Sequence, residues 1–171
     1  MDAKITITGV DEIKRAIAKI SNRVKNLEPI HAHIGNMILN SIEDSFEKEA
    51  SPFGQKWKPL KIRTIHQSYR GKRYTKRGKH TKAFQRHVSG KKILTNSGTL
   101  SSSFSVDADD SGVAVGTNLI YAPIHQFGGY AGRSKSAKIP ARPYLPIDSS
   151  KRLESGLQSD ILEYLKKKII N

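Results

Sequence analysis

Apolar residues recur at helical spacing in three stretches of the chain. The first follows a helix cap at Asp11, and the second ends before Pro52, because the residue before a proline disfavours helical backbone. The third is C-terminal, with Ser149 or Ser150 as its cap. The apolar positions are Ile13, Ile17, Ile20 and Val24, then Ile30, Ile34, Met37 or Ile38, Ile42 and Phe46, and finally Leu153, Leu157, Ile161, Leu165 and Ile169. This pattern predicts three amphipathic helices.

Shorter stretches alternate between polar and apolar residues or carry turn signals. Residues 4–8 (KITIT) and residues 100–106 predict strands. The turn signal DDSG at residues 109–112 predicts a hairpin whose second strand covers residues 113–116. Residues 121–127 either continue this sheet or turn away from it.

The remaining segments have no clear period. Residues 128–138 hold three glycines and predict a flexible loop, and residues 139–147 hold three prolines and predict an extended segment. The order of elements predicts an α+β fold, in which a small antiparallel sheet packs against two N-terminal helices and one C-terminal helix. A long basic loop is inserted between the helices and the hairpin.

Charge is concentrated in that insertion. The chain has 171 residues, with 30 Lys and Arg against 15 Asp and Glu, a net charge of +15. Residues 55–92 hold 14 basic residues and no acidic one. We therefore expect a single domain over residues 1–171 with a mobile basic insertion at about 55–92, of which residues 69–87 are mostly loop. Trp57, Pro59 and Leu60 near its start predict an apolar anchor to the body.

Such a block of like charge repels itself and attracts anionic surfaces, above all polyphosphate. Three interpretations remain open, namely a solvated loop that serves solubility alone, contact with DNA, and contact with an acidic protein. The candidate contact residues are Arg70, Lys72, Arg73, Lys76, Arg77, Lys79, Lys82 and Arg86.

Several classes of chemistry find no support. The chain has no cysteine, which excludes disulfides, thiolate metal sites and a cysteine nucleophile. His31 and His33 lie two residues apart on a predicted helix and point away from each other, so they cannot share a metal. His125 lies among apolar residues, where a buried, hydrogen-bonded structural role is expected. We expect neither catalysis, metal nor cofactor.

Membrane and export signals are also missing. No apolar run approaches the roughly 20 residues that cross a bilayer. Residues 1–10 lack the basic flank and apolar centre of a signal peptide. The sequence predicts a soluble protein made in the cytoplasm, without a membrane partner.

Five ordered blocks provide a more specific signal. They are SPFGQKWKPL at residues 51–60, KILTNSGTL at 92–100, VAVGT at 113–117, YAPIHQFGG at 121–129 and IPARPYL at 139–145. Together they resemble the tailed-phage virion morphogenesis family, the tail-completion proteins of Mu-like phages and prophages. The resemblance runs from about Phe46 to the C-terminal helix.

The resemblance implies a structural role in the virion, in the tail and neck, with assembly in the host bacterial cytoplasm. A protein of this kind completes or terminates the tail and joins it to the head. It implies a homo-oligomeric ring, sixfold in many cases, whose partners are the tail tube and the head–tail connector proteins. The alternative is a sequence-independent nucleic-acid-binding protein that acts through the basic insertion, with non-specific contact to DNA.

The blocks at residues 121–129 and 139–145 also predict a subunit interface. A bulky residue before two glycines suits a sharp exit from the sheet. The proline-rich stretch at residues 139–145, called the strap below, is stiff. Ordinary packing within the domain explains these features equally well. The candidate interface residues are His125, Gln126, Phe127, Gly128, Gly129, Pro140, Arg142 and Pro143.

Overall fold

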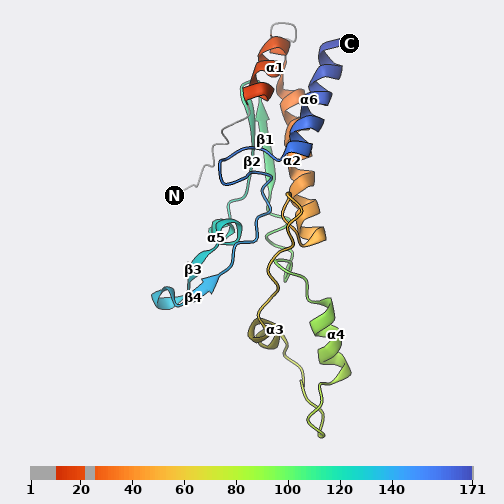
Figure 1. Ribbon diagram of the computed structural model, residues 1–171, viewed down its shortest axis with the longest axis vertical. Helices are drawn as coiled ribbons and strands as arrows, with labels where there is room; N and C mark the ends of the chain where they lie inside the picture. The colour runs from red at the N-terminus through yellow and green to blue at the C-terminus, as the bar shows by residue number, and fades with distance from the viewer. Residues whose placement is uncertain (1–10, 22–25, 171) are drawn as a thin grey trace.

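Three helices form one end of an elongated molecule. The computed structural model describes residues 11–21 and 26–170. Helix α6 (Ser155–Ile170) packs against both α1 (Asp11–Ser21) and α2 (Glu28–Lys48), as Figure 1 shows. The buried residues of their shared core are Ile13, Leu27, Ile30, Ile34, Leu153, Leu157, Ile161 and Leu165. The apolar stripes thus correctly predicted the three helices.

Two predictions at the N-terminal end cannot be compared with the structure. The strand predicted at residues 4–8 and the helical position Val24 lie outside the described residues. The predicted end of the second helix is confirmed, because α2 stops at Lys48, before Pro52.

The cap of α6 differs from the prediction. The carboxylate of Glu154 accepts hydrogen bonds from the backbone N–H groups of Gly156 and Leu157, each at 2.8 Å. The predicted caps, Ser149 and Ser150, lie in a turn before the helix begins. A side chain that accepts from the free N–H groups of the first turn is what defines an N-cap, so Glu154 holds that role.

The antiparallel hairpin of β1 (Ser105–Asp109) and β2 (Gly112–Gly116) packs on α2. The two strands approach the helix closely at Gly35, where a Cβ atom would overlap the side chains of Val106 and Val113. The predicted hairpin is confirmed, although its first strand begins at Ser105 and the residues before it form turns. Glycine at this position lets helix and sheet share one core.

The tip of this hairpin fixes the start of α2. The carboxylate of Asp110 accepts hydrogen bonds from the backbone N–H groups of Leu27 at 2.7 Å and Glu28 at 3.1 Å. The buried side chain of His31 bonds through Nδ1 to the carbonyl oxygen of Asp109 at 2.5 Å. An anionic side chain is favourable beside a helix N-terminus, so the tip serves as a cap from a distant part of the chain.

A second apolar cluster lies at the C-terminal part of α2 and forms the core of the rest of the body. Ile38 packs against both clusters. The buried residues of the second cluster are Ile42, Phe46, Trp57, Ile93, Leu100, Ala122 and Tyr144. Five of these seven residues lie in the five blocks of the resemblance, and Ile42 and Phe46 of α2 lie outside them.

Residues 121–139 are more regular than the sequence predicts. Residues 121–127 leave the sheet as helix α5 (Ala122–Phe127), which has Pro123 in its first turn. The expected flexible loop at 128–138 is wrong, because β3 (Gly129–Ala131) pairs with β4 (Ala137–Ile139) in an antiparallel hairpin. A short 3-10 turn, η1 (Arg133–Lys135), joins the two strands.

The basic segment, residues 55–92, is not the long loop that the sequence predicts. It contains helices α3 (Ile62–Ser68) and α4 (Lys82–Gly90). Figure 1 shows both at the end of the molecule opposite to α1 and α6. The α+β class is confirmed, with two separate two-stranded antiparallel sheets. Among the described helices, none has a stretch long and apolar enough to span a bilayer.

Candidate functional site

The basic segment has a small aromatic core of its own. Phe84 of α4 is 0% exposed. Its ring lies 5.0 Å from the ring of His66, 5.2 Å from that of Tyr69 and 4.9 Å from that of His80. Edge-to-face aromatic contacts of this kind add to the burial of apolar area. The sequence reading missed this core because a single phenylalanine sets up no apolar period.

A tight turn forms the tip of the basic segment, between α3 and α4. Thr75 donates its backbone N–H to the carbonyl of Lys79 at 2.7 Å, and Thr81 donates to the carbonyl of Arg73 at 2.8 Å. Gly78 lies inside this turn with φ of 72°, a backbone conformation that favours glycine. The tip is therefore a defined structure that presents its side chains outward.

All eight candidate cations of the basic segment are exposed. Among the described residues, none of the ion pairs involves the segment. The eight side chains extend from α4, from the tip turn and from the chain before it, and they are Arg70, Lys72, Arg73, Lys76, Arg77, Lys79, Lys82 and Arg86. The segment thus offers an uncompensated cationic surface.

Both ends of the basic segment are tied to the body at one residue, Glu49. Its carbonyl accepts from the backbone N–H of Trp57 at 2.9 Å, where the segment begins. Its carboxylate accepts from the N–H of Ile93 at 2.5 Å, where the segment has just ended. Glu49 is the left-handed C-cap of α2, with φ of 50°. The C-cap residue of α2 therefore holds both ends of the basic segment.

The predicted apolar anchor is confirmed at Trp57. The indole is buried, its ring lies edge-on to that of Phe46 at 5.5 Å, and its Nε1 donates to the carbonyl of Pro143 at 2.7 Å. Arg142, which is also buried, donates from Nε to the carbonyl of Lys58 at 2.9 Å. The strap and the start of the basic segment therefore hold each other.

Gln126 and Arg142, two of the candidate interface residues, act within the chain. The side-chain oxygen of Gln126 accepts from the backbone N–H groups of Tyr144 at 2.9 Å and Leu145 at 3.0 Å. Arg142 also donates its backbone N–H to the carbonyl of His125 at 2.7 Å. These bonds join α5 to the strap and account for the two buried side chains by packing within the domain.

Phe127 and the following glycines lie differently. Phe127 is 60% exposed, although it ends helix α5. Gly128 has φ of 73°, and a Cβ atom there would lie 2.8 Å from the backbone nitrogen of Ala141. The sharp exit from the sheet expected at these glycines is instead a turn from helix α5 into strand β3, which brings the chain close to the strap. The subunit interface itself stays a prediction.

His125 does not have the hydrogen-bonded role that the sequence predicts. Its Nδ1 is buried and makes no hydrogen bond to any described group. Burial, and then the positive charge of Arg142, lower the pKa of His125 below its usual value. The imidazole is therefore held neutral. His31 and His33 have different neighbours, since His31 bonds to the carbonyl of Asp109 and the ring centroid of His33 lies 4.1 Å from that of Tyr164.

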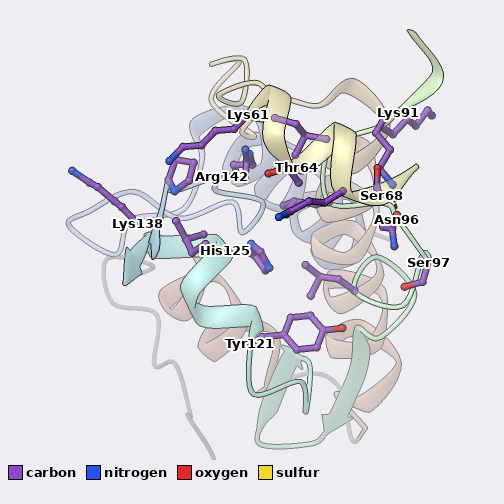
Figure 2. Close-up of a pocket in the computed structure, with 17 residues that line it drawn as sticks. Lys61, Thr64, Ser68, Lys91, Asn96, Ser97, Tyr121, His125, Lys138 and Arg142 are labelled. Carbon is purple, nitrogen blue, oxygen red and sulfur yellow. Dashed lines mark hydrogen bonds between the residues drawn. The ribbon is translucent and has the colours of Figure 1, made fainter. Parts of the chain in front are cut away.

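A cleft of about 560 Å³ lies between the basic segment and the strap. Figure 2 shows His125, Lys61 and Lys138 on one side of it, Lys91 and Asn96 on the other. The residues that line this root cleft are Leu60, Lys61, Thr64, Gln67, Ser68, Lys91, Lys92, Leu94, Asn96, Ser97, Leu100, Tyr121, His125, Lys138, Ile139, Pro140 and Arg142. Five of them are cationic and none is acidic.

Only parts of this cleft were predictable from the sequence. His125, Pro140 and Arg142 were predicted as interface residues, whereas no pattern singled out Lys61, Lys91, Lys92 or Lys138. The lining comes from four separate stretches of the chain, which no local pattern connects. In the part of the chain that the structure describes, no group of His, Asp and Glu is arranged to hold a metal ion.

Comparison with known proteins identifies the family. The family model described as "Phage virion morphogenesis family" matches residues 9–166. The chain belongs to this family. The match extends beyond the five blocks to α1 and most of α6, so it covers both apolar clusters, the basic segment and the root cleft.

Two relatives carry related descriptions. The protein is 28% identical over 161 residues to "Mu-like prophage FluMu G protein 2" of Haemophilus influenzae, covering 94% of each chain. It is 30% identical over 120 residues to "Putative capsid assembly protein G" of Escherichia phage Mu, covering 66% of this chain and 64% of the relative. No solved structure matches.

These similarities confirm the resemblance to the tailed-phage virion morphogenesis family. The protein is a member of the phage virion morphogenesis family, a family of structural assembly proteins associated with the virion. The site that this member presents is a cationic segment with a cleft at its root.

Proposed function

We propose that this protein is a structural, non-enzymatic component of the phage neck that completes or terminates the tail and joins it to the head. Membership of the phage virion morphogenesis family over residues 9–166 carries this proposal. A relative described as a putative capsid assembly protein supports a role in assembly. The partners are the tail tube and the head–tail connector proteins, in a virion assembled in the host bacterial cytoplasm.

The proposal includes self-association into a closed ring such as a hexamer. Exposed apolar side chains in and beside α5 support it, since Ile120 is 97% exposed and Phe127 and Tyr130 are each 60% exposed. Exposed aromatic side chains are enriched at protein interfaces. Rings arise when one face of a copy meets a different face of the next copy.

A genetic experiment tests the joining role. Removing the gene from a phage or prophage that encodes it should leave DNA-filled heads and tails that are not attached to each other. Electron microscopy of the lysate distinguishes the outcomes. Intact, joined particles in the absence of the protein would overturn the proposal.

Sedimentation velocity tests the ring. We expect a closed oligomer of the wild-type protein, alone or with tail tubes added. The double variant Phe127→Asp and Tyr130→Asp should not form it. A matched control is Asn40→Asp, an added charge on the exposed side of α2, which should assemble normally. A protein that stays monomeric in both conditions contradicts self-association.

The second candidate function is sequence-independent binding of nucleic acid. The basic segment favours it, because all eight candidate cations are exposed and none of the described ion pairs neutralises them. Affinity for duplex DNA should then fall steeply with salt, because each neutralised phosphate releases counterions. The double variant Lys76→Glu and Arg77→Glu at the tip should weaken binding and flatten that dependence. Unchanged affinity removes the segment from DNA binding.

A further inference from the structure

The root cleft differs from the rest of the basic segment in its chemistry. Its cations line a cleft together with apolar side chains, whereas those of the tip lie on an exposed turn. Lys61, Lys92 and Lys138 make no ion pair with any described residue. Lys91 is held by the side-chain oxygen of Asn96. Three lysine side chains are therefore free to meet an anion in the same cleft.

The walls of the root cleft are apolar. Leu60, Leu94, Leu100, Ile139 and Pro140 all line it. A volume of about 560 Å³ lies within the range of sites that enclose a ligand. A phosphate backbone is met by exposed cations and gains nothing from leucine side chains. A ligand with both carboxylates and apolar groups satisfies this lining, and an acidic peptide has both.

His125 adds a polar group to the cleft. Its Nδ1 lacks a hydrogen bond among the described groups, and its neutral ring lies between Lys61 and Tyr121 in Figure 2. A buried polar atom without a partner costs free energy. Because a histidine ring turns about its side-chain bonds, a bound carboxylate can accept from this nitrogen.

The chain itself has no suitable acidic segment among its described residues. Asp109 and Asp110 bond to the hairpin turn and to the start of α2. Glu43, Asp44 and Glu47 are exposed, but they lie on helix α2, and a helix with its side chains is about 10–12 Å wide. These acidic groups are thus either bonded within the chain or carried on a helix. The proposal therefore takes the occupant from a different protein.

We propose that the root cleft binds an extended acidic segment of a partner protein. Carboxylates of the segment would meet Lys61, Lys92 and Lys138, and an apolar side chain between them would pack against Leu94 and Ile139. The bound segment would touch both the basic segment and the strap, and so fix one relative to the other. The inference concerns a single chain and does not depend on ring formation.

Fluorescence anisotropy with a short labelled peptide that alternates Glu and Leu tests the proposal. The double variant Lys61→Glu and Lys138→Glu should bind the peptide roughly tenfold more weakly or worse. Both lysines are exposed, so the variant should fold. The matched control is Lys76→Glu and Arg77→Glu at the tip, with the same change of net charge and no contact with the cleft. This control should keep nearly all of the affinity.

Other outcomes decide against the cleft. Equal loss in the cleft variant and the tip variant would show binding to overall charge and overturn the proposal. So would equal binding of a peptide that alternates Glu and Ser, because the apolar walls would then play no part. A further outcome is that inorganic phosphate or a short DNA duplex displaces the peptide, with its own binding weakened equally by the changes at Lys61 and Lys138. The cleft would then be a phosphate site, and the proposal would be overturned. Sedimentation of the same samples reports ring formation separately.

Discussion

The body and the basic segment use different physical means to hold their structure. The body is nearly neutral and buries two clusters of aliphatic and aromatic side chains. One lies along the N-terminal part of α2 and the other along its C-terminal part. The basic segment holds 14 cations and no acid, and beyond its Trp57 anchor it buries one phenylalanine among histidines and a tyrosine. Burial of apolar area therefore stabilises the body, whereas local caps, turns and one aromatic cluster shape the segment.

This difference predicts two levels of stability within one chain. Regions with few buried apolar contacts open at lower free energy than the core does. The segment also repels itself, because its like charges have no counter-charge within the described residues. We expect it to unfold separately from the body, and an anionic partner to stabilise it.

The largest effect should come from the core of the body. Ile161 is 0% exposed in the cluster shared by α1, α2 and α6. Ile161→Ala removes buried carbon atoms and leaves a cavity, so the free energy of unfolding should fall by about 2–5 kcal/mol. Urea denaturation followed by circular dichroism measures it. Asp160→Ala, exposed on the same helix, is the control and should change little. An unaltered midpoint for Ile161→Ala would place this cluster outside the stabilising core.

The next effect should be confined to the basic segment. Phe84→Ala removes its central ring, a change that costs about 3–5 kcal/mol in a packed core, and should unfold α3 and α4. Hydrogen exchange should show faster exchange of the amides in residues 62–90 and unchanged protection in α2 and α6. Arg86→Ala on the same helix should leave exchange as it was. Loss of protection throughout the molecule would mean that body and segment unfold as one unit.

A smaller effect should appear at the cap of α6 and depend on pH. Burial raises the pKa of Glu154, but hydrogen bonds from Gly156, Leu157 and Ser155 together outweigh it and leave the pKa lowered. A carboxyl whose folded pKa is below its unfolded value stabilises the fold at higher pH and loses that effect as pH falls through the folded pKa.

Glu154→Gln should therefore lower the free energy of unfolding by about 0.3–1 kcal/mol near neutral pH. The difference from wild type should shrink in acid, where both side chains are uncharged. Thermal unfolding at the two pH values checks it, with Asp160→Asn as a control. A difference that persists in acid would mean that the charge of Glu154 has no part in the cap.

The smallest effect should come from the tip. Arg77→Glu changes an exposed side chain, so the free energy of unfolding should stay within about 0.5 kcal/mol of wild type. Gly78→Ala in the same turn forces a side chain into left-handed backbone, and should destabilise the turn by about 1–2 kcal/mol. Backbone NMR shifts of residues 73–81 compare the two. A turn disturbed equally by both would show that its charges, and not its backbone, set its shape.

The sequence predicted the body well because its signals are periodic. Ile30, Ile34 and Ile42 repeat over enough turns to define α2, and the DDSG turn defines the hairpin. The helices α4 and α5 were missed for a physical reason. In α4 only Phe84 is buried, and α5 is too short for a period, although Pro123 in its first turn is a helix-start signal.

The candidate site was predictable only in part. The charge block predicted the exposed cations of the basic segment, and Trp57 predicted its anchor. The root cleft was not predictable, because Lys61, Lys92 and Lys138 meet only after α5, the strap and the segment have packed together. Such a site depends on long-range contacts that one sequence does not reveal.

The two hydrogen bonds at Glu49 determine how far the basic segment can vary in length. Because the carbonyl and the carboxylate of one residue receive the chain where the segment leaves and where it returns, the body is already closed at that point. Residues 58–60 still pack against the second cluster and the strap, so the part that can change in length without displacing either cluster begins after Leu60. The length of the segment is therefore not fixed by the packing of the body.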